Sequence, residues 1–159
     1  MKWVGPYRLR HLLENSVNDK QPWPPEHNGV YVISQKEWTE LPTADCLPLY
    51  AGGTTGKSAR FCTRVGDLIA DMLGFFGKET GHHSGGQHLY DFCEKYQINP
   101  LDLFLGWAEQ CSCFRCAETS IVNNLAPRLN RKAPPQCPKH KAKDYKKKPL
   151  TTASRGTRE

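Results

Sequence analysis

Two short runs of sequence decide the fold, GVYVIS at residues 29–34 and LPLYAG at residues 47–52. Both are rich in β-branched and aromatic residues, which predicts two consecutive strands. The nearly apolar run LDLFLGW at residues 101–107 predicts a third, buried strand. Two strands in succession, followed by helices, favour an α+β fold with a small three-stranded antiparallel sheet flanked by helices, and not a parallel doubly wound sheet.

Other segments repeat apolar residues at helical spacing. Residues 58–75 form the clearest helix, and residues 87–96 and 117–125 predict two more. Residues 7–14 predict a short N-terminal helix, which the proline-rich run at 22–25 separates from the first strand.

A length of 159 residues suits one domain with a hydrophobic core and is short for two. We predict a helix and a proline-rich linker over residues 1–27, the domain over residues 28–140 and a disordered basic tail over residues 141–159. No apolar run approaches the ~20 residues that span a bilayer, and the N-terminus lacks the apolar stretch of a signal peptide. We therefore expect a cytoplasmic protein without a membrane partner.

The net charge of +6 belongs to the C-terminal end of the chain. Residues 131–159 hold ten Lys and Arg against two acids, whereas residues 1–130 hold twelve against fourteen. A basic tail attracts polyanions through counterion release, although an unbound solvated tail has the same composition. This charge predicts nucleic-acid contacts from four lysines of the tail: Lys143, Lys146, Lys147 and Lys148.

Residues 51–58 (AGGTTGKS) match a loose phosphate-loop pattern between a predicted strand and a predicted helix. The chain lacks the repeated βα units that build a nucleotide-binding sheet. It also lacks a following apolar strand that ends in an aspartate for magnesium, since Asp102 stands at the start of its strand. We expect no nucleotide cofactor, keep a phosphate-loop nucleotide hydrolase as the lesser alternative, and assign Lys57 to nucleic-acid contact.

Two tripeptides stand on adjacent predicted strands, GVY at residues 29–31 and YAG at residues 50–52. A tyrosine in a strand is commonplace. Here the pair is followed by an arginine-bearing helix, then a helix with a glutamate, then an asparagine. In this order the elements resemble the GIY-YIG nuclease superfamily, and the resemblance covers residues 28–140.

The resemblance extends to individual positions of the chain. Arg64 best matches the arginine of the family, and Arg60 lies one turn earlier on the same face as the alternative. Glu118 stands on the later helix, and Asn130 follows Pro127, as the family pattern requires. The resemblance thus implies five site residues: Tyr31, Tyr50, Arg64, Glu118 and Asn130.

The chain departs from the family pattern at three points. Ala51 replaces the usual Ile or Val of the second tripeptide, and a longer loop after Tyr50 leaves the arginine ambiguous. Some members carry a histidine one turn after the arginine, where this chain has Leu68. If a histidine is needed, His82 or His83 in the expected loop 77–86 would have to serve.

The family resemblance implies a metal-dependent endonuclease that hydrolyses the phosphodiester bonds of DNA. Glu118 would hold one Mg²⁺ or Mn²⁺, because a hard cation takes one or two carboxylates and keeps several waters. Arg64 would offer a planar fork to phosphate, while Tyr31 would take a proton from the attacking water that Tyr50 positions. Cutting both strands with one small site would need a homodimer or two visits. The rival interpretation is a non-catalytic, zinc-containing nucleic-acid-binding protein.

Seven cysteines in a chain without an export signal indicate metal binding before disulfides. Cys113 and Cys116 form a CxxC, and Cys137 and His140 form a CxxH, two knuckles typical of a tetrahedral structural zinc site. Cys111 is the alternative to Cys113 as the first ligand. The other three cysteines have no partner in the sequence and are predicted to be small buried hydrophobes: Cys46, Cys62 and Cys93.

Overall fold

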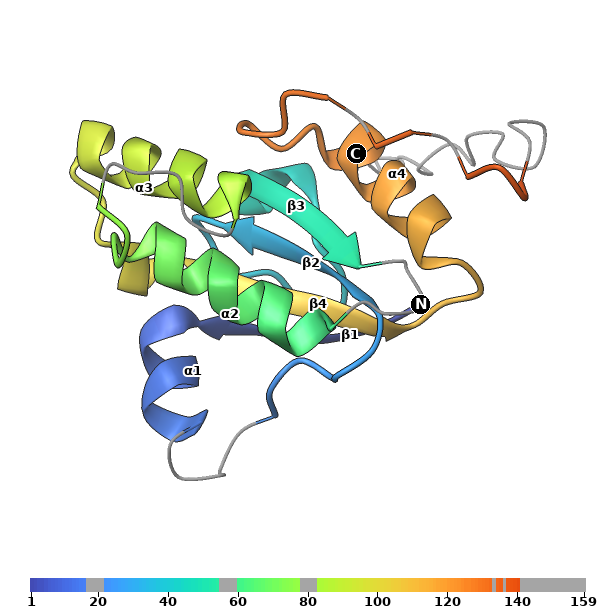
Figure 1. Cartoon of the computed structure of the whole chain (residues 1–159), viewed down its shortest axis with the longest axis horizontal. Coiled ribbons are helices and arrows are strands. Elements are labelled where there is room, and N and C mark those ends of the chain that lie inside the picture. Colours follow the sequence, from blue (N-terminus) through green and yellow to red (C-terminus); the bar gives the residue numbers. More distant parts are fainter. Residues whose placement is uncertain (17–21, 55–59, 78–82, 133, 136, 141–159) are drawn as a thin grey trace, which may run out of the picture.

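The fold is α+β, built on one antiparallel sheet of four strands in the order β1-β4-β2-β3 (Figure 1). The computed structural model describes residues 1–16, 22–54, 60–77, 83–132, 134–135 and 137–140. The strands are β1 (Lys2–Arg8), β2 (Gly29–Ser34), β3 (Pro48–Thr54) and β4 (Phe104–Gln110).

Helices cover both faces of this sheet. The helices are α1 (Leu9–Ser16), α2 (Phe61–Met72), α3 (Ser84–Tyr96) and α4 (Phe114–Leu125), with short 3-10 turns at Ala44–Cys46 and Pro100–Asp102. Apolar side chains of α1, α2 and α3 form one core with one face of the sheet, whereas α4 packs on the opposite face (Figure 1). The fold class predicted from the sequence is thereby confirmed.

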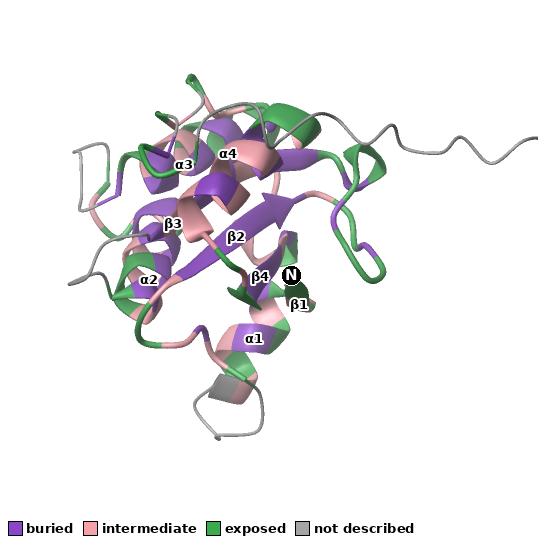
Figure 2. Ribbon diagram, turned by 90° about the vertical axis from the view of Figure 1, so that its right-hand side faces the viewer, coloured by how far each residue is buried: buried purple, intermediate pink, exposed green. Residues whose placement is uncertain are grey.

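β2 lies between β4 and β3 and is buried along its whole length (Figure 2). Because successive side chains of a strand point to opposite faces, Tyr31 and Ile33 enter the core under α1, α2 and α3. Val30 and Val32 enter the core under α4. This burial on both sides explains the nearly continuous apolar run in the sequence.

The predicted three-stranded sheet was wrong by one strand. Residues 2–8 form β1, which pairs with β4 through contacts such as Val4 with Trp107 and Tyr7 with Leu105. Gly5 and Pro6 interrupt the alternation of apolar residues by which a strand is recognised. Proline is tolerated here because β1 lies at the edge of the sheet. The first 27 residues therefore supply a strand as well as the predicted helix.

Several element boundaries also differ from those predicted. α3 begins at Ser84, inside the expected loop, because His83 caps its first turn. The third predicted strand begins only at Phe104, since residues 100–102 form a 3-10 turn after Asn99. α4 begins at Phe114, three residues before the predicted start, and within the described chain α2 begins at Phe61.

α2 and α3 pack closely where α3 begins. A Cβ added to Gly86 would lie 2.5 Å from the Cβ of Asp71 and 2.7 Å from the backbone oxygen of Leu68. The two helices can approach this closely only because position 86 lacks a side chain. Gly66, on α2, has open space beside its Cα instead, because apart from its chain neighbours and the backbone of its own helix no atom lies within 4 Å of an added Cβ.

These two glycines allow a matched test of the packing. Gly86→Ala should lower the free energy of unfolding by roughly 1–3 kcal/mol, because the new methyl meets backbone and a buried side chain. Gly66→Ala should raise it by about 0.5–1 kcal/mol, because alanine restricts the unfolded chain and fits the helix. Urea denaturation of both variants measures these changes, and a Gly86→Ala protein as stable as wild type would contradict the close approach.

Candidate functional site

Tyr31 and Tyr50 lie side by side on the α2–α3 face of the sheet. The register pairs Tyr31 with Gly52 and Ile33 with Tyr50, so both tyrosines point to the same face, with ring centroids 6.2 Å apart. A Cβ on Gly52 would lie 2.6 Å from the Tyr31 hydroxyl oxygen, and one on Gly85 would lie 2.3 Å from the Tyr50 ring. The two glycines therefore leave the room that the phenol rings occupy.

His83 completes an aromatic triad with these tyrosines. Its Nε2 lies 3.1 Å from the hydroxyl oxygen of Tyr31, and its ring centroid lies 6.0 Å from that of Tyr50. The Nδ1 atom accepts hydrogen bonds from the backbone N–H groups of Gly85 and Gly86, at 3.1 and 3.3 Å. Of the two histidines singled out in the sequence, His83 reaches the tyrosines, and His82 lies outside the described residues.

Burial is the main cause of the pKa shifts of these three side chains. It raises the pKa of Tyr31 well above the usual value, and the nearby Tyr50 raises it further. The pKa of Tyr50 is also raised by burial. Burial, assisted by the positive charge of Arg64, lowers the pKa of His83 to about 4. At neutral pH, then, both phenols and the imidazole are uncharged.

Arg64 and Glu118 bring opposite charges to the tyrosines from α2 and α4. Arg64 lowers the pKa of both Tyr31 and Tyr50, and Glu118 raises both, so each charge lies near both phenols. The pKa of Glu118 itself is raised by burial and lowered by Arg64 and Arg115. Among the described residues Glu118 has no ion pair within 4.0 Å. A half-buried carboxylate thus stands beside the phenols without a fixed cationic partner.

The two candidate arginines differ in position. Arg64 is exposed in the first turn of α2, and its charge acts on both tyrosines and on His83. Arg60 is exposed as the residue that precedes α2, and its side chain makes no capping hydrogen bond. The surroundings of the tyrosines thus favour Arg64 as the arginine of the site.

Asn130 uses its amide to hold the outer edge of β3. Its Oδ1 accepts from the backbone N–H of Ala51 at 2.9 Å, and its Nδ2 donates to the Ala51 carbonyl at 2.8 Å. The preceding residues continue this contact, since the N–H groups of Arg128 and Leu129 donate to carbonyl oxygens of β3. Asn130 therefore fixes the strand that carries Tyr50, a role that sequence spacing alone did not predict.

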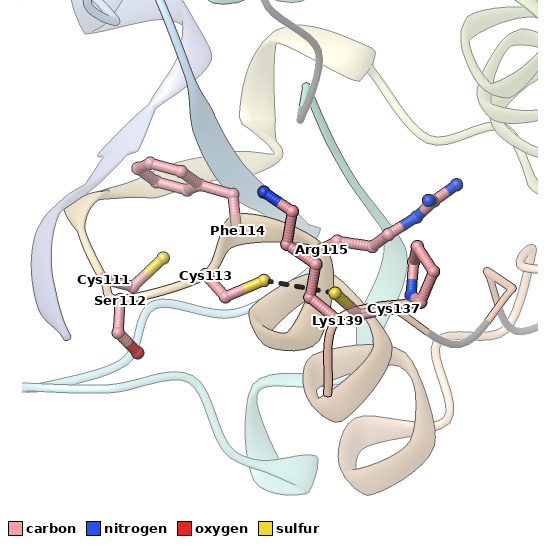
Figure 3. Close-up of a pocket in the computed structure, with 8 residues that line it drawn as sticks. Cys111, Ser112, Cys113, Phe114, Arg115, Cys137 and Lys139 are labelled. Carbon is pink, nitrogen blue, oxygen red and sulfur yellow. Dashed lines mark hydrogen bonds between the residues drawn. The ribbon is translucent and has the colours of Figure 1, made fainter. Parts of the chain in front are cut away.

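A second site lies at the beginning of α4. The ligand atoms of Cys113, Cys116, Cys137 and His140 all lie within 4.8 Å of one another, and the Cys113 and Cys137 sulfurs are 3.7 Å apart (Figure 3). The Nδ1 atom of His140 lies 3.4 Å from both Cys116 Sγ and Cys137 Sγ. Three sulfurs and one imidazole nitrogen could hold a metal ion such as zinc.

Cys111 does not belong to this cluster, although it lines the same hollow at the surface (Figure 3). Burial raises the pKa of the Cys111 thiol. A backbone hydrogen bond from Cys116 lowers the pKa of Cys113, and a hydrogen bond with His140 lowers that of Cys137. Since the thiolate is the ligand form, these surroundings favour Cys113 over Cys111 as the first ligand.

The three remaining cysteines are free thiols. Cys46 and Cys93 are buried, whereas Cys62 is only partly buried. The prediction that these cysteines are buried is therefore correct for Cys46 and Cys93 and wrong for Cys62. The lysines assigned to nucleic-acid contact lie outside the described residues: Lys57, Lys143, Lys146, Lys147 and Lys148.

No family model, curated protein or solved structure matches the chain. Its resemblance to the GIY-YIG nucleases therefore stays a prediction from the motifs. In the described part of the chain, every helix is too short or too polar to cross a membrane.

The cysteine–histidine cluster predicts that the stability of the protein depends on a bound metal ion. The purified protein should contain one zinc ion per chain, and Cys137→Ser should lose it, because a three-ligand remainder binds more weakly. The melting temperature should then fall by at least about 5 °C, the effect of roughly 2 kcal/mol in a chain of this size. Mass spectrometry for metal content and thermal unfolding measure both quantities.

Cys111→Ser is the matched control, because Cys111 lies beside the cluster without joining it. It should keep the zinc and the wild-type melting temperature. Equal damage from both substitutions would contradict the assignment of Cys113, and a folded wild-type protein without metal would contradict the site as a whole.

Proposed function

We propose that the protein is a Mg²⁺-dependent endonuclease that hydrolyses phosphodiester bonds of DNA. The supporting observation is the convergence, from five different segments of the chain, of two phenols, an imidazole, a guanidinium group and a carboxylate. These groups belong to Tyr31, Tyr50, His83, Arg64 and Glu118. Motif order in the sequence and proximity in space are independent arguments for four of these residues, Tyr31, Tyr50, Arg64 and Glu118, whereas His83 is placed by the structure.

Packing alone does not account for this set of residues. Placing a hydroxyl group in an apolar core costs free energy unless it is hydrogen-bonded, and Tyr31 is fully buried. Its hydroxyl is paired with Nε2 of His83, and a phenylalanine would fill the same volume without needing that buried partner. Groups whose pKa values are displaced by burial and by specific neighbouring charges are enriched at functional sites, and here three such residue types meet.

Each side chain has chemistry suited to phosphodiester hydrolysis. The exposed guanidinium of Arg64 offers paired N–H donors that match phosphate oxygens and can stabilise the charge that develops on them. Tyr50 is partly exposed and can orient the attacking water by its hydroxyl. Tyr31 would accept a proton from that water as the phenolate, after its own hydroxyl proton has left. This role requires a nearby positive charge, which Arg64 supplies, because burial opposes ionisation of the phenol.

Glu118 is the residue that would hold the divalent ion. Its carboxylate is half-buried and free of ion pairs within the described residues, and a single carboxylate with water ligands suits Mg²⁺. When bound, the ion would polarise the phosphoryl oxygen and offset charge on the leaving oxygen. The cysteine–histidine cluster is a different kind of site, since four protein ligands leave no open position for a substrate.

Cleavage of supercoiled plasmid tests the function and the role of Glu118. Wild type should nick the plasmid with Mg²⁺ and remain inactive in EDTA. Glu118→Gln should lose at least ~10²-fold in rate, because it removes the charge that would hold the ion while keeping the side-chain volume. The exposed Glu37 provides the control, and Glu37→Gln should cut like wild type. Plasmid binding without cleavage by wild type would instead support a non-catalytic nucleic-acid-binding protein.

Arg64 in the first turn of α2 and Arg60, which immediately precedes that helix, form a second matched pair. Arg64→Ala should slow single-turnover cleavage by at least ~10²-fold, the usual loss when a preorganised donor to the transition state is removed. Arg60→Ala should weaken DNA binding and leave the rate at saturation nearly unchanged. The reverse pattern would mean that the residue one turn earlier is the arginine of the site.

A further inference from the structure

All four polar atoms of His83 have hydrogen-bonding partners within the protein, including the backbone carbonyl oxygen, which accepts from the N–H of Gln87. Its backbone N–H donates to Oδ2 of Asp71, its Nδ1 accepts from two backbone N–H groups, and its Nε2 faces the Tyr31 hydroxyl. The side chain is 2% exposed, and Asp71 is 1% exposed. A single histidine thus joins α2, the first turn of α3 and the central strand of the sheet.

We infer that His83 is a positioning residue for Tyr31: the cap of α3 holds its ring with the proton on Nε2, and this N–H donates to the Tyr31 hydroxyl oxygen. This role adds a positioning residue to the proposed nuclease site. Only the expected effect of His83 on the cleavage rate rests on the proposed function. The hydrogen-bond arrangement itself can be tested on any folded preparation of the protein.

The first step concerns Nδ1. The backbone N–H groups of Gly85 and Gly86 both point at this atom, at 3.1 and 3.3 Å, and an N–H can only donate. Nδ1 must therefore present its lone pair and carry no proton. Since burial holds the pKa of His83 at about 4, the ring is neutral at pH 7 and its one proton resides on Nε2.

The second step concerns Tyr31. With Nε2 as the donor at 3.1 Å, the hydroxyl oxygen of Tyr31 accepts, and its own hydrogen must point away from His83. The oxygen lies directly over Gly52, where β3 has no side chain. One lone pair is thus occupied by a fixed donor, and the O–H remains available to a partner other than His83. Such a donor also stabilises the oxygen when it bears negative charge.

The third step concerns rigidity. The ring cannot easily turn over, because this would place an N–H or a carbon against the two capping N–H groups. The cap is itself packed tightly, since a Cβ on Gly85 would meet the Tyr50 ring and one on Gly86 would meet Asp71. The tautomer of His83 is therefore set by the helix and does not depend on Tyr31.

Nuclear magnetic resonance of the ¹⁵N-labelled full chain tests this directly. At pH 7, long-range ¹H–¹⁵N spectra should show a neutral His83 ring protonated at Nε2. In Tyr31→Phe the tautomer should persist, while the Nε2–H proton should shift upfield because its acceptor is gone. A ring protonated at Nδ1, a doubly protonated ring at pH 7, or an unshifted Nε2–H in Tyr31→Phe would overturn the inference. None of these readouts needs nuclease activity.

Two substitutions distinguish the hydrogen bond of His83 to Tyr31 from the capping of α3 by His83. His83→Asn keeps an oxygen that can cap the helix but has no donor that reaches Tyr31, whereas His83→Ala removes both. His83→Asn should melt closer to wild type than His83→Ala, yet cleave roughly 10-fold to 10²-fold more slowly than wild type. Combining it with Tyr31→Phe should cause no further loss beyond Tyr31→Phe alone.

A folded His83→Asn protein that cleaves at the wild-type rate would overturn the positioning role. A wild-type protein that cleaves nothing would refute the proposed nuclease function, and the spectra would still decide the hydrogen-bond arrangement. Failure of the inference and failure of the proposed function are thereby distinguishable.

Discussion

The register between β2 and β3 is the constraint on which the candidate site depends. It sets Tyr31 opposite Gly52 and Tyr50 opposite Ile33, so that both phenols enter the same face of the sheet. A slip of one residue would turn β3 over and send Tyr50 toward α4. Asn130 holds β3 from its outer edge, because both of its amide atoms bind the backbone of Ala51.

Because β3 lies at the end of the sheet, helices from opposite faces reach the same sheet edge. α2 supplies Arg64 and the residue before α3 supplies His83 on one face, while α4 on the other face carries Glu118 beside the same edge. The cysteine–histidine cluster joins the beginning of α4 to the chain beyond Asn130. A bound metal ion would therefore restrain both segments that approach β3 from outside the sheet.

Patterns of local sequence predicted β2, β3, the long helices and the paired cysteine knuckles, because each depends on spacing within one segment. β1 was missed because Gly5 and Pro6 break its alternation, and its pairing with β4 joins distant parts of the chain. The choice of His83 over His82 could not be made from adjacent letters, since it depends on which one caps α3. Likewise, the bonds of Asn130 to Ala51 span 79 positions, and no local pattern encodes them.

The central claim is that residues from both faces of the sheet act as one catalytic unit. A double-mutant cycle on the single-turnover cleavage rate, with Tyr31→Phe and Glu118→Gln, tests it most directly. Groups that act together lose activity non-additively, so the double variant should cleave no more slowly than the slower single variant. Rate losses that multiply would assign Tyr31 and Glu118 to independent roles and contradict the account, as would the absence of Mg²⁺-dependent cleavage by the wild-type protein.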